Sequence, residues 1–125
     1  MFQNQIQENF NLFESKRTTA NWNQIAKHNP NIFYIPYETI CTSCAEGFQG
    51  SGLKIIDNFK FENITGACNH CFYGCRLNEL PEIINFLKCT DLRCTFDYTT
   101  FDDVPENVTL NIGYKSNTNS NVSLY

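Results

Sequence analysis

Two Cys-x-x-Cys pairs constrain this chain more than any other feature of its sequence. They are Cys41-Thr-Ser-Cys44 and Cys68-Asn-His-Cys71, and 23 residues separate them. A turn with this spacing can aim two thiolates at one point, and two such turns brought together complete a tetrahedral shell of four sulfurs. The spacing therefore predicts one metal site, with Zn²⁺ as the ion and these four cysteines as its ligands.

The segment between the two pairs predicts how they would meet. Leu53–Ile56 and Phe59–Glu62 flank Asp57-Asn58, and this pattern is typical of a β-hairpin with a two-residue turn. Together with the cysteines, it resembles the zinc-ribbon and treble-clef class of four-cysteine zinc domains over Tyr37–Lys88. The resemblance implies two metal-binding knuckles around a hairpin, with a helix packed after them.

Other chemistries use the same four residues. An iron–sulfur cluster also takes four thiolates, so it is the alternative cofactor. A redox-active pair at Cys41 and Cys44 would need a helix to start at the first cysteine, yet Gly47, Gly50 and Gly52 follow. Disulfides are a further alternative, although seven cysteines cannot all pair within one chain.

Three cysteines remain outside the two pairs. Cys75, Cys89 and Cys94 could form a second Cys₃His site with His28, or Cys75 could replace a ligand of the first site. Free cysteines are also common as small buried apolar residues, which is the interpretation favoured for Cys94. His28 is expected in a surface turn, and His70 is expected to be exposed.

Hydrophobic periodicity predicts the first part of the chain. Apolar residues spaced four, four and three apart over 2–13 predict an amphipathic helix, and a second, short helix is expected over 22–27. The aromatic and β-branched segment 32–40 indicates an edge strand interrupted by Pro36. The sequence indicates no internal repeat.

The second half predicts a helix and two strands. The residues Leu80, Ile83, Ile84 and Leu87 follow the helical spacing, so a helix is expected over 78–88. Alternating segments at 92–99 and 108–114 predict an antiparallel strand pair. The predicted fold is therefore a small α+β domain: a four-cysteine, zinc-ribbon-like hairpin with a packed helix, an N-terminal amphipathic helix and a C-terminal antiparallel strand pair. Its regions are a helical arm (1–30), a zinc-stapled α+β domain (31–114) and a polar tail (115–125).

Composition limits the function. The 125 residues carry a net charge of −4 and no cluster of Lys or Arg, so autonomous binding of nucleic acid is not expected, although Phe72 and Tyr73 are candidate exposed aromatic residues for it. No catalytic motif occurs, and Asp102-Asp103 indicates a solvated loop. We therefore expect a non-catalytic zinc-binding structural or interaction subunit of a multiprotein complex.

Two alternatives and the compartment complete this interpretation. The chain could be a zinc-ribbon accessory factor of a transcription or translation machine, or a disulfide-rich secreted domain. The three Asn-x-Ser/Thr sites do not favour secretion, because 17 Asn and 17 Ser plus Thr residues yield roughly two such sites by chance. The first ten residues are too polar for a signal peptide, and no stretch is apolar enough to span a membrane. We expect an intracellular protein, with the mitochondrion or another organelle as candidate compartment because Asn, Phe, Ile, Tyr and Lys, which AT-rich genes favour, make up 51 of 125 residues.

Overall fold

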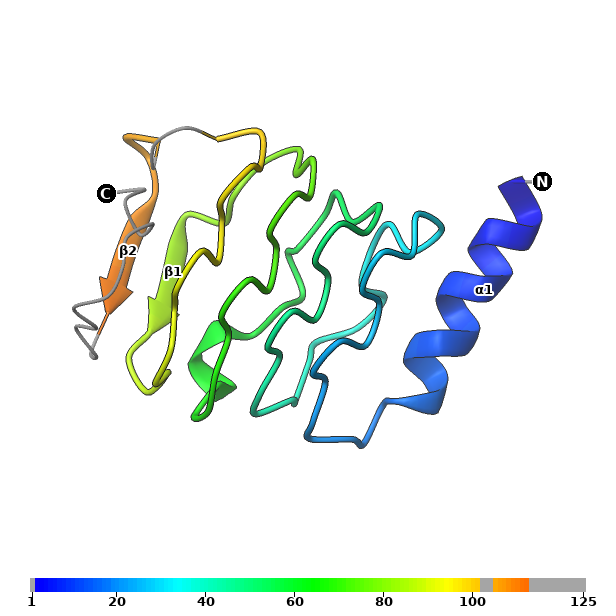
Figure 1. Ribbon diagram of the computed structural model, residues 1–125, viewed down its shortest axis with the longest axis horizontal. Helices are drawn as coiled ribbons and strands as arrows, with labels where there is room; N and C mark the ends of the chain where they lie inside the picture. Colours follow the sequence, from blue (N-terminus) through cyan, green and yellow to red (C-terminus); the bar gives the residue numbers. More distant parts are fainter. Residues whose placement is uncertain (1, 102–104, 113–125) are drawn as a thin grey trace.

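Regular secondary structure is scarce in this chain. The computed structural model describes residues 2–101 and 105–112, and it contains four elements in chain order: α1 (Phe2–Ser15), the short 3₁₀ helix η1 (Phe61–Asn63), β1 (Ile83–Phe86) and β2 (Thr109–Ile112). In Figure 1, α1 lies at one end, the two strands lie at the other, and a row of similar loops fills the space between them. The loops therefore make up most of the fold.

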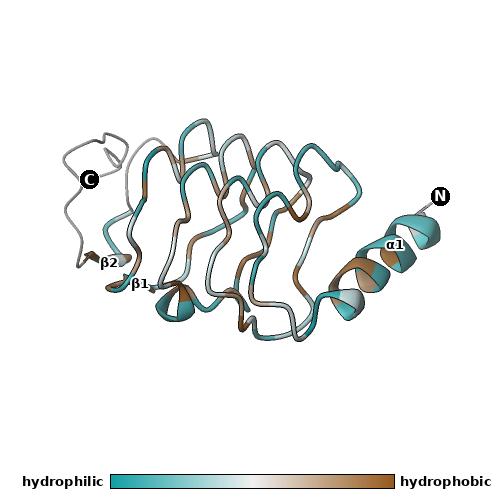
Figure 2. Cartoon of the chain, turned by 60° about the horizontal axis from the view of Figure 1, so that its bottom comes forward, coloured by the Kyte–Doolittle hydropathy of each residue, from teal (hydrophilic) through white to brown (hydrophobic). Residues whose placement is uncertain are grey.

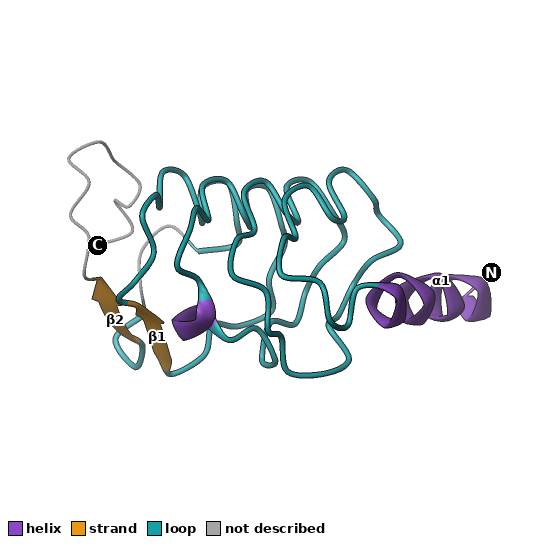
Figure 3. Ribbon diagram, turned by 90° about the horizontal axis from the view of Figure 1, so that it is seen from below, coloured by secondary structure: helices purple, strands orange, loops and turns teal. Residues whose placement is uncertain are grey.

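These loops are successive rungs of a short solenoid. Parallel bridges join Asn21 to Ser43 and Ala67 to Asp91, so residues 22 and 24 positions apart lie side by side. We number the rungs 1 (21–42), 2 (43–66), 3 (67–90) and 4 (91–112, without 102–104). Figure 3 shows them edge-on as a row of arches. Each rung stacks on its neighbours, which is the principle of repeat proteins.

Backbone hydrogen bonds hold the rungs together along one side. Each rung contains a turn segment there (23–28, 45–50, 69–74 and 93–98). Twelve N–H groups in or next to the first three segments donate to carbonyls of the following rung at 2.8–3.0 Å, for example Phe48 to Cys71 and Phe72 to Thr95. The intervening N–H groups donate within their own rung, as Gly47 does to the Cys44 carbonyl at 2.9 Å. The turns therefore leave few backbone donors unpaired.

The other sides of the rungs also pair in parallel. Tyr34 of rung 1 bridges Ile55 of rung 2, and β1 of rung 3 pairs with β2 of rung 4, with Ile84 opposite Leu110. In Figure 2, rungs and helix both carry hydrophilic and hydrophobic stretches, as expected when each element has one buried side.

Aromatic rings form the core. Phe48, Phe72 and Phe96 occupy equivalent positions, and their rings stack at centroid distances of 5.9 and 5.6 Å. The equivalent residue of rung 1 is Ala26, whose small side chain cannot extend the stack. Phe13 of α1 takes its place, stacking on Phe48 at 6.2 Å.

The helix closes the first end of the solenoid. Besides Phe13, it contributes Asn9, which is fully buried. The Asn9 amide donates to the Tyr34 carbonyl at 2.8 Å and accepts from the Phe33 N–H at 2.9 Å. It therefore satisfies backbone groups that have no preceding rung to bind.

Several elements differ from the sequence predictions. The amphipathic N-terminal helix is confirmed as α1, but 22–27 forms turns rather than a helix, and 32–40 contributes only the bridge at Tyr34. No hairpin forms around Asp57-Asn58, because Ile55, two residues before Asp57, pairs in parallel with Tyr34 of rung 1. The prediction of a zinc-ribbon hairpin is therefore wrong.

The C-terminal predictions also need correction. Residues 78–88 contain β1 instead of a helix: Ile84 and Phe86 are buried while Ile83 and Leu87 are exposed, and this alternation of sides is that of a strand. The segment 92–99 forms turns, and β2 confirms a strand within 108–114, but its partner is β1 and the pairing is parallel. The antiparallel strand pair is wrong. The tail at 115–125 lies outside the described residues.

The expectation of no internal repeat was also wrong. Cys44, Phe48 and Gly50 correspond to Cys68, Phe72 and Gly74, which gives the pattern Cys-x₃-Phe-x-Gly twice at a spacing of 24. The cysteine pairs concealed it, because aligning one Cys-x-x-Cys with the other implies a spacing of 27. The structural equivalence is Cys44 with Cys68.

Candidate functional site

The four paired cysteines meet inside the solenoid. Cys41 enters from the end of rung 1, Cys44 from rung 2, and Cys68 and Cys71 from rung 3, and all four are fully buried. The Cys44 thiol is hydrogen-bonded to the thiols of Cys41 and Cys71, and the Cys71 thiol also interacts with that of Cys68. The sequence thus identified four residues that the structure brings together, although it placed them on the wrong scaffold.

A glycine makes room for this thiol cluster. Gly47 of rung 2 is equivalent to Cys71 of rung 3, and a Cβ atom at Gly47 would lie 2.2 Å from the Cys44 Sγ. The absence of a side chain lets the Cys44 sulfur occupy that space. In rung 4 the equivalent residue is Thr95, whose hydroxyl donates to the carbonyls of Leu92 and Cys68.

The cluster distributes its protons unequally. Hydrogen bonding to Cys44 and burial raise the pKa of Cys41, and burial raises the pKa of Cys68 and of Cys71. Burial opposes ionisation of Cys44 as well, but hydrogen bonds from Cys41 and Cys71 outweigh it and lower its pKa. Cys44 is therefore the sulfur on which a negative charge is best stabilised.

The arrangement of the cluster is that of hydrogen-bonded thiols. Within residues 2–101 and 105–112, no group of three or more His, Cys, Asp or Glu side chains is placed so that it could hold a metal ion. All seven cysteines of the chain lie in these ranges, and all are free thiols. The structure therefore shows the predicted ligands together without the geometry of a metal centre.

The remaining cysteines do not assemble into a second site. Cys75 is buried near the Ser51 hydroxyl and donates to the Phe48 carbonyl at 3.0 Å, and Cys89 donates to the Asp91 carbonyl at 3.4 Å. Cys94, expected to be buried, is partly exposed in a turn and interacts with the Asp97 side chain. His28 is exposed in a turn, as expected.

The two knuckle residues that flank Cys71 differ from expectation. His70 is only partly exposed, and its Nδ1 atom is buried without a hydrogen-bond partner in the described part of the chain. Phe72 is fully buried in the aromatic stack and is unavailable to a nucleic acid. Asp102 and Asp103 lie outside the described residues.

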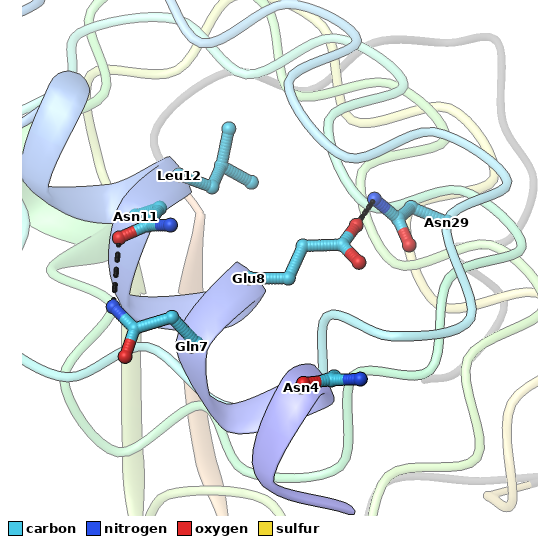
Figure 4. A pocket seen from close by; sticks show the side chains of 6 residues that line it. All are labelled: Asn4, Gln7, Glu8, Asn11, Leu12 and Asn29. Carbon is cyan, nitrogen blue, oxygen red and sulfur yellow. Dashed lines mark hydrogen bonds between the residues drawn. The ribbon is translucent and has the colours of Figure 1, made fainter. Parts of the chain in front are cut away.

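A polar hollow of about 510 Å³ lies between α1 and rung 1 (Figure 4). Glu8 points across it, and its carboxylate accepts hydrogen bonds from Asn29 and Asn31 at 2.9 Å each. These bonds lower the pKa of Glu8. Because the Glu8 carboxylate is already paired with these two amides, it fastens α1 to rung 1.

Comparison with known proteins adds no function. No protein-family model matches the chain, and no curated protein or solved structure is significantly similar to it. In the described part of the chain, no helix has the length and apolar character needed to cross a membrane.

Proposed function

We propose that this chain is a non-catalytic interaction subunit of a larger intracellular assembly, in which the outer surface of the solenoid contacts a protein partner. The architecture supports the proposal, because a repeat protein buries each rung against its neighbours and presents a long continuous surface. Seven free thiols are consistent with a reducing compartment.

An apolar strip on that surface carries the proposal. It consists of Phe10, Tyr34 and Ile55, which come from α1, rung 1 and rung 2. The rings of Phe10 and Tyr34 meet edge to face at 6.0 Å, and Tyr34 bridges Ile55. Phe10 and Ile55 are 45% and 44% exposed, so the strip presents apolar surface that folding leaves in water. Such surface is typical of a protein interface.

A pair of matched variants tests this function. The tagged chain of residues 1–125 is used to purify partners from extracts of its source cells, with quantitative mass spectrometry of wild type, Ile55→Ser and Ile83→Ser. Both isoleucines are exposed, but Ile83 lies in β1, outside the strip. We expect one partner whose recovery falls at least tenfold with Ile55→Ser and is unchanged with Ile83→Ser. Equal recovery with all three chains would contradict the proposal.

The thiol cluster supports a second candidate function, the binding of structural zinc. Four buried sulfurs from three successive rungs are already neighbours, and modest side-chain movement would be required to place them about 2.3 Å from one ion. Elemental analysis and native mass spectrometry of chain purified without added metal test this. We expect one zinc per chain, lost in Cys44→Ser and retained in Cys94→Ser. Iron with visible absorbance would favour the iron–sulfur alternative, and a metal-free chain would contradict both.

A further inference from the structure

A second hollow, of about 470 Å³, crosses three rungs on the side that follows the turn segments. Its lining comes from α1 and from rungs 1, 2 and 3: Gln5, Pro30, Phe33, Ser51, Gly52, Lys54 and Arg76. The volume lies within the range of small-molecule sites. No sequence motif drew attention to it, because its residues are spread over 72 positions of the chain.

The repeat explains why the hollow exists. Pro30, Gly52 and Arg76 follow one another at the rung spacings of 22 and 24. A Cβ atom at Gly52 would lie 2.3 Å from the Pro30 carbonyl oxygen, so the backbones of rungs 1 and 2 approach closely there. At Gly52 the middle rung thus contributes bare backbone between Pro30 of rung 1 and Arg76 of rung 3.

The positive charge of its lining marks this second hollow as a binding site. Lys54 and Arg76 are both exposed, and neither forms an ion pair or a side-chain hydrogen bond among the residues that the structure describes. By contrast, Lys27, Lys60, Arg17 and Arg93 all have carboxylate partners. None of the lining residues is acidic. An acidic chain has therefore placed two uncompensated cations in one hollow.

Rung stacking holds these cations near each other. The Asn78 N–H donates to the Lys54 carbonyl at 2.9 Å, so the segment after Arg76 runs beside the segment of Lys54. The Lys54 N–H donates in turn to the Phe33 carbonyl at 3.0 Å, which holds Phe33 of rung 1 beside Lys54 of rung 2. Two like charges held together repel, and a dianion between them would remove that repulsion.

We propose that this hollow binds a small phosphate monoester with an aromatic or apolar body. A phosphate monoester carries a charge of about −1.5 to −2 at pH 7, which matches one lysine and one arginine, whereas a carboxylate supplies only one charge. The arginine fork can bind two phosphate oxygens and the lysine acts as a point charge. Phe33 and Pro30 provide the apolar wall for the body of the ligand.

Nuclear magnetic resonance titration of the ¹⁵N-labelled full chain tests the proposal, with phenyl phosphate as the probe. We expect the largest shift changes at the amides of Gly52, Lys54 and Arg76. Benzoate has the ring without the dianion, and inorganic phosphate has the dianion without the ring, so each should bind at least fivefold more weakly. If benzoate or inorganic phosphate bound as tightly as phenyl phosphate, the proposal that the hollow recognises both the dianion and the ring would be overturned.

Charge-matched variants locate the site. Lys54→Gln and Arg76→Gln should each weaken phenyl phosphate at least fivefold, and both side chains are exposed, so the fold should persist. Lys88→Gln removes the same charge from an exposed residue that does not line the hollow, and it should change affinity less than twofold. A similar loss in all three variants would overturn the site, since it would indicate nonspecific attraction to the surface.

Discussion

At the residue scale, the fold depends on backbone conformations that most side chains disfavour. Every described residue with a positive φ lies at one of two equivalent positions in a turn segment: Gln24, His28, Glu46, Gly50, His70, Gly74, Cys94 and Tyr98. Only two of these eight are glycines, although a side chain there costs roughly 1 kcal/mol. The hydrogen bonds between rungs offset this cost. Because six positions carry ordinary residues, local sequence preferences could not have predicted the turns.

Two glycines should therefore respond differently to the same substitution. Gly74 has a φ of 77°, but its nearest neighbour for a new Cβ atom is 3.7 Å away, so Gly74→Ala should cost only the backbone term of about 1 kcal/mol. Gly47→Ala would place its Cβ atom 2.2 Å from the Cys44 Sγ and should cost about 3 kcal/mol or more. Urea unfolding measures both. Equal losses would show that Gly47 does not provide the space for the thiol cluster.

Cys75 makes stability depend on alkaline pH. Burial raises the pKa of its thiol to about 11, whereas an unfolded thiol titrates near 8.5. The contribution of this group is therefore complete below about pH 8.5 and is lost as the pH rises toward 11, at up to about 1.4 kcal/mol per pH unit. Between pH 8 and 10, wild type should lose about 2 kcal/mol more than Cys75→Ser in urea unfolding with reductant present. Parallel losses in the two proteins would contradict the assignment.

At the scale of elements, the structure separates patterns that reflect real periodicity from patterns that arise by coincidence. The apolar stripe predicted α1 but not its buried side: Phe13 is buried, whereas Phe10 of the same stripe is 45% exposed and the polar Asn9 is fully buried. The helical spacing of Leu80, Ile83, Ile84 and Leu87 gave a wrong prediction, because the structure buries Ile84 and Phe86 of β1 and exposes Ile83 and Leu87. The alternation at 92–99 gave a wrong prediction for a different reason: the buried residues in and next to this turn segment are Leu92, Thr95 and Phe96, which do not follow the two-residue spacing of a strand. The convergence of the paired cysteines was predictable from spacing, but their scaffold was not.

The cap formed by α1 should depend on one amide. Asn9→Leu would remove the fully buried amide that binds the Tyr34 carbonyl and the Phe33 N–H, so two partly buried backbone groups would lose this partner at a cost of about 2–4 kcal/mol. Asn4→Ala, on the exposed side of the same helix, should change stability by less than about 0.5 kcal/mol. Thermal unfolding followed by circular dichroism compares the two. A small effect of Asn9→Leu would mean that the first rung does not need its cap.

At the scale of the whole molecule, each rung is stabilised mainly by contacts with the rungs on either side of it along one axis. The Phe13, Phe48, Phe72 and Phe96 rings form a column from the helix to rung 4, and the hydrogen bonds between turn segments run beside it. Each rung contacts mainly its neighbours, so an interior rung is held from two sides and a terminal rung chiefly from one. A repeat architecture of this kind need not unfold all at once.

Phe72 and Phe96 should reveal this difference. Phe72 lies against four other rings, those of Phe48, Phe59, Phe61 and Phe96, whereas Phe96 lies against only Phe72 and Phe86 among the described residues. Phe72→Ala should cost about 3–5 kcal/mol, within the range for buried aromatic truncation, and Phe96→Ala should cost less.

Hydrogen exchange shows where each loss is felt. In Phe96→Ala, the amides of Cys68, His70, Phe72 and Gly74, which donate to rung 4, should lose protection, while those of rungs 1 and 2 keep it. In Phe72→Ala, protection should also fall for the amides that join rung 2 to rung 3, because the interior of the column is interrupted. If both variants lowered protection equally along the whole described part of the chain, the four rungs would be a single cooperative unit.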